Sequence, residues 1–390
     1  MLIQGIKLEI KMYYSEYCIS LLRKLISIPS ESQNEENIAN FLCSWLEDMG
    51  MQVKMQHISG KSCNVIASAR GKRKEKQHKK LLLGGHIDTV SPNDRWRTDP
   101  YCLKEDGNFL YGLGTGDMKG GLAAQVTVLK KLFDSNLDFS GEIEFIGLAD
   151  EERHSIGAHA YVKEKKAEYP ADFAILAEPH YDNIVIGATG KALLNLDIRG
   201  ITGHASIPES GINAIDCMAL FINILNNEYT PLYKDNKAGS MCILRTFSKY
   251  EGYSLSIPEQ CTSYLNKQLN SDENIDDFIK NIKDLYERHV GKGELTITKE
   301  IPFYSSYKIN TDNAYFNNLL NIIYNNNNIL PELKINRSVS DGNILFAELS
   351  IPTVLYGPQG VNYHKENEYV LKDTLLSYMG ILEKYIRLND

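Results

Sequence analysis

LLLGGHIDTV (residues 81–90), FLYGLGTGDMKGG (109–121), EIEFIGLADEE (142–152) and FAILAEP (173–179) are the most informative segments of the chain, because each is an apolar run followed by a histidine or an acidic residue. Short apolar runs of this kind are typical of buried strands. The residues at or just after their ends are His86, Asp88, Asp117, Glu151, Glu152 and Glu178. In an open α/β sheet the carboxyl ends of parallel strands meet at one edge, so we predict that these side chains converge there.

An imidazole among several carboxylates is a ligand set that suits zinc. The seven cysteines are scattered, odd in number and free of any CxxC pair, so they predict reduced thiols and not a sulfur cage. The sequence therefore predicts a metal site and a hydrolase.

The rest of the first half predicts an α/β fold. Helical spacing of apolar residues indicates two helices between residues 14 and 49. The further elements that we expect are strands at 52–57, 63–69, 80–87, 142–149 and 172–177, and helices at 116–133 and 155–165. Such alternation favours a largely parallel or mixed sheet that is covered by helices on both faces.

The pattern changes after about Gly190. KALLNLDIRGITGHAS alternates like a half-buried strand, and INAIDCMALFINILNN is typical of an amphipathic helix. Further strands are expected at MCILRTFS, YSLSI, CTSYLNKQL and ELTITKEI, with a helix at IDDFIKNIKDLYERHV. After about residue 303, a helix near 314–324 and a strand at 351–357 return to the first pattern. We predict a catalytic domain formed by residues 1–189 and 303–390, with an α+β domain inserted at 190–302.

Composition limits the class of protein. A chain of 390 residues favours two domains, and a net charge of −8 with a pI of about 5.7 argues against a nucleic-acid partner. The basic run 71–80 lies between two strand-like runs and predicts a solvated hairpin loop. The first residues lack the apolar stretch of a signal peptide, and no run is long enough to cross a bilayer. We therefore expect a cytoplasmic protein with no membrane contact.

Each candidate ligand also has a plainer interpretation. His86 and Asp88 point to the same side of an extended segment, so Asp88 can orient the imidazole, or the two can form an ordinary polar pair. Asp117, among glycines, can bridge two metals or cap the helix that follows. Among Asp150, Glu151 and Glu152, one carboxylate can bind metal while its neighbour takes a proton from water. Alternatively, the three acids stabilise a helix N-terminus.

Two further histidines lie in glycine-containing and proline-containing loops, where a histidine is more often merely solvated. His364 stands in GPQGVNYHKENEY (357–369), and His204 in GITGHASIPESG (200–211).

Taken together, GGHIDTV, GTGDMKGG, DEE, AEP, GHAS and a late histidine after GP resemble one family of hydrolases. It is the co-catalytic zinc family that contains acetylornithine deacetylase, succinyl-diaminopimelate desuccinylase, glutamate carboxypeptidase and peptidase T. The resemblance runs from about residue 15 to the end. It implies a zinc-peptidase-like mixed sheet flanked by helices, with an inserted domain that serves as lid and dimer contact. It also implies two zinc ions, with cobalt or manganese as substitutes, and a homodimer.

The resemblance assigns a role to each candidate. It implies that one metal is held by His86, Asp117 and Glu178, and the other by Asp117, Glu152 and His364. Glu151 becomes the general base, Asp88 supports His86, and the Asp117–Met118 peptide is expected to be cis. His204 matches a histidine that reaches the partner subunit's active site in dimeric relatives and stabilises the oxyanion there.

The substrate contacts depart from the family pattern. Relatives that act on acylated amino acids carry an Asn and an Arg where this chain has Leu255 and Gln268. A substrate carboxylate needs another cation, for which Arg337 is the best candidate, with Arg245 and Lys267 as weaker ones. In the same segment, Ser340, Asp341 and Asn343 are candidate substrate contacts.

These observations predict a dizinc amidohydrolase that removes the acyl group of an N-acyl amino acid. A dipeptidase, tripeptidase or carboxypeptidase of the same family is the alternative. A metal-binding relative without catalysis is a third possibility, against which the intact Glu151 argues.

Overall fold

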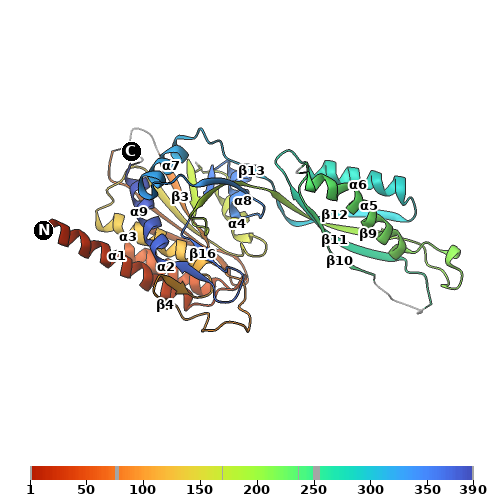
Figure 1. Cartoon of the computed structure of the whole chain (residues 1–390), viewed down its shortest axis with the longest axis horizontal. Coiled ribbons are helices and arrows are strands. Elements are labelled where there is room, and N and C mark those ends of the chain that lie inside the picture. The colour runs from red at the N-terminus through yellow and green to blue at the C-terminus, as the bar shows by residue number, and fades with distance from the viewer. Residues whose placement is uncertain (1, 75–78, 169, 236, 249–254, 389–390) are drawn as a thin grey trace. The chain divides into compact units, whose positions relative to one another are not determined.

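The computed structural model describes residues 2–74, 79–168, 170–235, 237–248 and 255–388, with side chains from residue 9 onward (Figure 1). The chain forms two compact units. The first comprises Met1–Gly187, Lys308–Asn336 and Ser340–Asp390, and the second comprises Ala188–Tyr307 and Arg337–Val339.

A large mixed sheet forms the centre of the first unit. In spatial order its strands are β1 (Gln52–Ser59), β2 (Ser62–Arg70), β6 (Glu142–Leu148), β3 (Lys80–His86), β7 (Phe173–Leu176), β15 (Thr353–Leu355), β8 (Asn183–Ala188) and β13 (Tyr307–Lys308), and β14 (Glu332–Asn336) pairs with β8. The pairs β6–β3, β3–β7 and β7–β15 are parallel, whereas β1–β2, β2–β6 and β15–β8 are antiparallel. The predicted α/β fold with a mixed sheet is confirmed.

Helices cover both faces of this sheet. They are α1 (Leu2–Ile26), α2 (Glu36–Met49), α3 (Gly120–Asp134), α4 (Ile156–Lys165), α7 (Ala314–Asn327), α8 (Asp341–Leu349) and α9 (Lys372–Leu388). Neighbouring strand residues point to opposite faces. The Asn64 amide donates to the Gly157 carbonyl of α4, at 2.8 Å. Val65 instead lies beside Gly147, on the side where Leu42 of α2 packs. The sheet therefore separates α4 from α2.

One glycine sets the distance between α3 and the sheet. A Cβ atom on Gly121 would lie 2.3 Å from the Ala177 carbonyl oxygen, just after β7. Only glycine permits this approach of helix backbone to strand backbone. The start of α3 is thereby held against the end of β7.

A small antiparallel sheet joins two distant loops of the same unit. Its strands, in spatial order, are β16 (Gly360–Val361), β17 (Tyr369–Leu371), β5 (Phe109–Tyr111) and β4 (Lys104–Asp106). Tyr369 pairs with Tyr111, and Leu371 with Phe109. The segment that follows β5 and the loop between β16 and β17 therefore lie next to each other.

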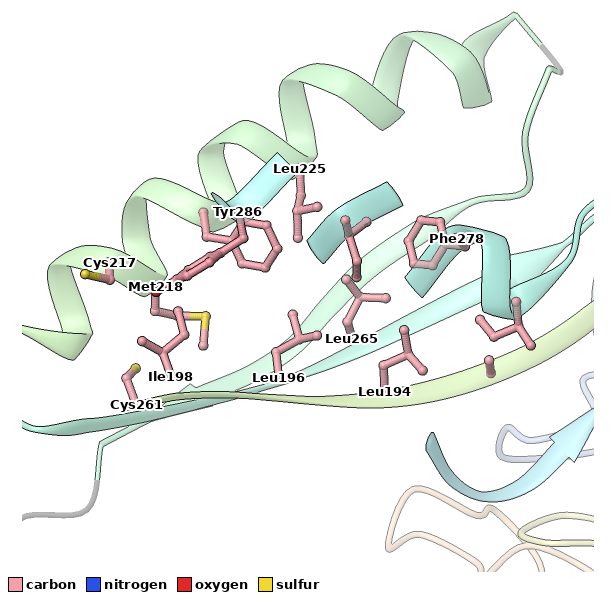
Figure 2. Packing of buried hydrophobic residues seen from close by; sticks show 14 of the residues in the cluster. Leu194, Leu196, Ile198, Cys217, Met218, Leu225, Cys261, Leu265, Phe278 and Tyr286 are labelled. Atoms are coloured by element: carbon pink, nitrogen blue, oxygen red, sulfur yellow. The ribbon is translucent and has the colours of Figure 1, made fainter. Parts of the chain in front are cut away.

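The second unit is a four-stranded antiparallel sheet packed against two helices. The strands, in spatial order, are β10 (Met241–Phe247), β11 (Gln260–Leu269), β9 (Gly190–Arg199) and β12 (Glu294–Tyr304), and the helices are α5 (Ala214–Lys234) and α6 (Ile275–His289). Buried and half-buried residues alternate along β9, as its sequence predicts. Figure 2 shows Leu194, Leu196 and Ile198 pointing from β9 toward Met218 of α5 and other core residues.

The loop at 71–80 is not a hairpin loop, so that prediction is wrong. Strand β6 lies between β2 and β3, and β3 runs parallel to β6. The chain therefore crosses to a strand that is not its neighbour. Lys80 belongs to β3, where it is buried and lies 2.9 Å from the Glu144 carboxylate. Residues 75–78 of the run lie outside the described residues.

The expected strand YSLSI is not observed where it can be compared. Its first two residues, 253 and 254, lie outside the described residues. Leu255 is in a turn, and Ser256 makes only an isolated bridge with His204. Within the described part of the chain, no helix has the length and apolarity required to cross a membrane.

Candidate metal centre

The parallel strands of the large sheet bring the predicted ligands to one edge. His86 is the last residue of β3, Glu151 and Glu152 follow β6, and Glu178 follows β7. His364 lies in the loop between β16 and β17, after β15. This is the edge at which open α/β sheets bind ligands.

Two groups of three side chains form at this edge. His86, Asp117 and Glu178 form one, and Asp117, Glu152 and His364 form the other. Within each group the potential ligand atoms all lie within 4.8 Å of one another. Asp117 belongs to both, with Oδ1 3.0 Å from Nε2 of His86 and Oδ2 3.3 Å from Nε2 of His364. A carboxylate shared in this way can bridge two cations.

Asp117 does not serve as a helix cap. Helix α3 begins at Gly120, and its N-cap residue, Lys119, makes no side-chain cap bond. Asp117 lies instead in the short turn Thr115–Lys119, with a non-helical backbone conformation. The Asp117–Met118 peptide bond is cis, as the resemblance implies.

Asp88 connects the strand of His86 to the loop of the acidic residues. Its Oδ1 accepts a hydrogen bond from the Glu151 amide at 3.1 Å, and its Oδ2 accepts from the Glu152 amide at 3.2 Å. Nδ1 of His86 lies 3.0 Å from the Asp88 backbone carbonyl and 3.5 Å from its carboxylate. The backbone carbonyl of Asp88 is therefore the closer partner of the imidazole, whereas its carboxylate fixes the main chain of the next loop.

The acidic triplet does not begin a helix. Helix α4 starts at Ile156 and has no acidic residue in its first turn. Asp150 adopts a left-handed conformation with φ of 64°, and its carbonyl accepts hydrogen bonds from the amides of His154 and Ser155. This turn directs Glu152 toward His364, whose Nε2 lies 2.8 Å from Glu152 Oε2. The helix-dipole interpretation is therefore excluded.

The carboxylates of this site have raised proton affinity. Burial, reinforced by the charges of Glu178, Asp341 and Glu152, raises the pKa of Glu151 well above its ordinary value. Burial and the charge of Asp117 do the same to the pKa of Glu178, and burial raises the pKa of Glu152. Several carboxylates crowd into one buried site, and cations between them would relieve their repulsion.

The pKa values of the two histidines are raised as well, which for an imidazole means that the charged form is stabilised. Burial alone would lower the pKa of His86, but Asp117 and Asp88 raise it well above the ordinary value. Hydrogen bonds with Asp117 and Glu152 raise the pKa of His364 to about 10. The carboxylates around both imidazole rings therefore stabilise a positive charge at this site. The donor set, two imidazoles and three carboxylates with one of them shared, fits a pair of divalent cations of the zinc type.

Comparison with known proteins decides the family. The sequence model described as peptidase family M20/M25/M40 matches residues 82–388, which is more than half of the chain. The chain belongs to this family. Members of the M20 family are metal-dependent hydrolases of amide and peptide bonds.

The relatives of this M20 family member include enzymes that are named for different substrates. Acetylornithine deacetylase from Yersinia pestis is 35% identical over 210 residues, which cover 51% of this chain and 53% of the relative. The chain thus spans about half the length of the first curated relatives that it matches. Succinyl-diaminopimelate desuccinylase from Buchnera aphidicola is 27% identical, covering 94% of this chain and 98% of the relative.

The fold of the M20 chain is also that of solved structures. The crystal structure of a tripeptidase from Staphylococcus aureus has a TM-score of 0.79 with 24% identity, covering 96% of this chain and 98% of that chain. This similarity concerns the fold alone.

The predicted substrate residues of α8 have partners inside the M20 chain. Ser340 is the N-cap of α8: its hydroxyl accepts from the Gly342 amide at 3.2 Å, and Asn343 Oδ1 accepts from the Ser340 amide at 2.9 Å. This capping box orients the first turn of the helix, which carries Asp341. Burial, reinforced by the charges of Asp88 and Asp150, raises the pKa of Asp341 to about 7.

The cationic residues that were predicted to bind a substrate carboxylate belong to the second unit. Arg337 lies with Gln268, Thr189 and Asn270 along a pocket of about 160 Å³. Its side chain is exposed. The Thr189 hydroxyl donates to the Arg337 carbonyl at 3.1 Å and lies 3.2 Å from Gln268 Oε1. Arg337 and Gln268 are therefore neighbours within this unit.

The two weaker cation candidates have other partners. The ammonium of Lys267 is fully buried and donates to the carbonyls of Gly239 and Gln268 and to the Glu273 carboxylate at 2.6 Å. It is not accessible to a substrate, so this candidate is withdrawn. The guanidinium of Arg245 lies 4.1 Å from the ring centroid of Tyr264.

His204 is exposed on the second unit. The Ser206 amide, which can only donate, points at its Nδ1 at 3.2 Å, and the Ser206 hydroxyl lies 2.7 Å from the same atom. Nδ1 is therefore an acceptor, and a neutral ring carries its proton on Nε2. Nε2 is therefore the atom of this ring that can donate a hydrogen bond.

Two residues that support the site were not predicted from the sequence. Ser32 donates to Asp88 Oδ2 at 2.6 Å. The buried Glu368 accepts hydrogen bonds from the turn that carries Asp117. Each stands in a polar loop, ESQNEE or HKENEY, where no periodicity distinguishes it from its exposed neighbours. The sequence signal for Glu368 was slight: it is an acidic residue directly before a short apolar strand.

Proposed function

We propose that the chain is a dizinc amidohydrolase that removes the acyl group from an N-acyl amino acid. One observation carries the proposal: two groups of potential metal ligands share the carboxylate of Asp117. In this assignment His86 and Glu178 complete the first site, and Glu152 and His364 complete the second. Cobalt or manganese could take the place of zinc.

Glu151 is the proposed general base. A bound pair of zinc-type cations supplies a lowered pKa for the attacking water and polarisation of the scissile carbonyl. Glu151 belongs to neither ligand group found among the described residues, although it follows β6 beside Glu152. Its carboxylate would accept the proton of the attacking water and deliver it to the nitrogen of the leaving amine. Asp88 supports this role because it holds the Glu151 amide.

The second unit is proposed to serve as lid and dimer contact, with residues 190–302 as an inserted domain. His204 would donate a hydrogen bond from Nε2 to the oxyanion in the site of the partner subunit. The tautomer that Ser206 imposes supports this role. The test is to mix a His204→Ala variant with an Asp117→Asn variant, each of which alone has little or no activity. Shared sites between subunits should raise the activity in the mixed dimers, whereas sites completed within one chain would give no activity beyond that of the separate variants.

The substrate class rests on the relatives and on charge. The deacetylase and the desuccinylase both act on acylated amino acids, which carry a free carboxylate. We assign recognition of that carboxylate to Arg337, because its guanidinium is exposed beside Gln268, where relatives carry an arginine. Ser340 and Asn343 would act indirectly, by orienting α8 and Asp341.

A peptidase is the second candidate. The M20/M25/M40 family is described as a peptidase family, and Leu255 and Gln268 replace two residues typical of relatives that act on acylated amino acids. A changed substrate contact can mean a changed substrate. The active-site chemistry is the same for both, since both cleave an amide bond.

One screen separates the candidates. The full-length protein is incubated with N-acetylornithine, N-succinyl-diaminopimelate, other N-acyl amino acids and a panel of dipeptides and tripeptides, with zinc, cobalt or manganese added in turn. Preference for acylated amino acids would support the deacylase, and preference for peptides the alternative. Absence of turnover by a protein that holds two metals would contradict both and indicate a metal-binding protein without catalysis.

A matched pair of variants tests Arg337. Arg337→Ala should raise the KM of a carboxylate-bearing substrate at least tenfold, because a charge-assisted hydrogen bond is worth about 1.5–3 kcal/mol. It should have little effect on the corresponding amide substrate, which lacks that charge. Arg245→Ala removes a cation that stacks on Tyr264 and serves as the control. Equal KM changes for acid and amide would exclude the assignment.

A further inference from the structure

Glu368 is a buried acidic residue in the loop that carries His364. Its side chain is 2% exposed. One carboxylate oxygen, Oε1, accepts hydrogen bonds from the Gly116 amide at 2.8 Å and the Asp117 amide at 2.9 Å, and Oε2 accepts from the Gly114 amide at 2.8 Å. The backbone carbonyl of Glu368 accepts a further bond from the Gly112 amide at 3.1 Å. The residue is therefore the common acceptor for one segment, residues 112–117.

This segment is the turn that places the shared ligand. Aspartate has a short side chain, so the position of its oxygens follows closely from its backbone. The backbone of Asp117 is non-helical, with φ of −119° and ψ of 93°. It lies inside a turn that is closed by bonds from the Lys119 amide to the Gly114 carbonyl and from the Gly120 amide to the Thr115 carbonyl. The fit is close: a Cβ atom on Gly116 would lie 2.9 Å from Gly360 Cα and 3.2 Å from Glu368 Oε1. The amide of Asp117 itself is held by the carboxylate of Glu368.

Glu368 also connects the two loops of the second ligand group. Asp117 comes from the turn before α3, and His364 from the loop that ends at Glu368. The bond between the Asp117 amide and Glu368 spans 251 positions of sequence. The short pairing of β17 with β5 joins the same two loops, and Glu368 extends this connection to the turn of Asp117.

We propose that Glu368 is a positioning residue for the metal centre: it fixes the backbone of Asp117 so that Oδ1 faces the group of His86 and Oδ2 faces the group of His364. The inference rests on the proposed metal-binding function. A merely structural carboxylate would satisfy buried amides, and its loss would lower stability alone. A positioning carboxylate also sets metal affinity, and outer partners of metal ligands typically change that affinity by about 10–100-fold.

The test is zinc and cobalt binding by full-length Glu368→Gln. Glutamine is nearly isosteric, but its NH₂ group would face the amide of Gly114 or those of Gly116 and Asp117, so at least one of the three hydrogen bonds is lost. Glu368→Asp keeps the charge and cannot reach all three amides, and it serves as the second variant if the first folds poorly. The matched control is Glu144→Gln, which alters a buried glutamate that bonds Tyr161 and Lys165 within the same unit.

Zinc affinity is measured by competition with a chelator, and the geometry of the centre by the visible absorption of the dicobalt protein. We expect both Glu368 variants to bind the weaker zinc ion at least tenfold less tightly and to show an altered cobalt spectrum. Glu144→Gln should lower the melting temperature with unchanged zinc affinity and spectrum. If the Glu368 variants melt early but match the wild type in affinity and spectrum, the residue is only structural and the inference is wrong.

A third variant separates this inference from the proposed function. His364→Ala should reduce the cobalt content from two ions to one per chain. If it does so while the Glu368 variants bind metal normally, the metal centre stands and the positioning role fails. If the wild-type protein takes up fewer than two ions, or if His364→Ala has no effect, the proposed function itself is contradicted.

Discussion

The neighbouring residues Glu151 and Glu152 should respond in opposite ways to the same substitution. Glu152 lies 2.8 Å from His364 in a ligand group, whereas Glu151 belongs to neither group among the described residues. Asp88 holds both residues through their backbone amides, and replacement of either side chain leaves those bonds in place. Glu151→Gln should therefore keep both metals, and Glu152→Gln should lose one.

The expected size of the rate effect follows from the assigned role. A positioned general base contributes about 10²–10⁴-fold, which at 1.36 kcal/mol for each factor of ten is about 2.7–5.4 kcal/mol of transition-state stabilisation. Glutamine has almost the shape of glutamate but cannot accept the proton. We expect kcat to fall by that factor in Glu151→Gln, with KM nearly unchanged.

The assay is a kcat and KM determination on the best substrate of the screen, together with metal analysis of the same samples. Both variants should melt within a few degrees of the wild type when metal is present in excess. A Glu151→Gln protein that keeps a rate within tenfold of the wild type would refute the base assignment. Loss of metal by that variant would show that Glu151 is a ligand.

Three further predictions follow from the same geometry. Burial raises the pKa of Asp341 and of Glu368 to about 7, from ordinary values of 3.8 and 4.5. The folded, metal-free protein therefore binds protons more tightly than the unfolded chain does. Its melting temperature should accordingly be higher at pH 5 than at pH 8. A melting temperature that does not fall between pH 5 and pH 8 would contradict the raised pKa values of this buried acidic cluster. Lys267→Met should cost about 3 kcal/mol of unfolding free energy in urea, because Glu273 loses its buried partner; a change below about 1 kcal/mol would contradict this account. Finally, His204→Ala should lower kcat by about 10²–10³ and leave metal content unchanged, whereas a purely solvated His204 predicts no loss.

The acidic cluster explains why much of this site could be anticipated. Ligands stand at the ends of apolar runs, and parallel strands bring such ends together whatever the loops between them do. His86, Glu152 and Glu178 were identified by that rule. The glycines around Asp117 made it a candidate bridge between two metals, whereas the participation of His364 came from family resemblance, because a loop histidine is more often merely solvated.

Contacts between distant loops could not be anticipated. The two carboxylate oxygens of Asp88 accept from backbone amides 63 and 64 positions away, and Glu368 accepts from amides more than 250 positions away. A backbone amide is the same chemical group at every residue, so the sequence carries no mark of which one will be bound. The wrong prediction of a hairpin loop at 71–80 has a similar cause, since the periodicity of a strand does not reveal which other strand it pairs with.

The α/β class, the position of most strands and helices, and the set of metal-type side chains could all be inferred from the sequence. These features depend on local periodicity and on residue type, which are present in the linear chain. Three features became visible only in the folded chain: β6 separates β2 from β3, Lys267 is buried against Glu273, and Glu368 holds the turn of Asp117. These outcomes depend on strand order and on packing between segments distant in sequence, and no local pattern encodes either.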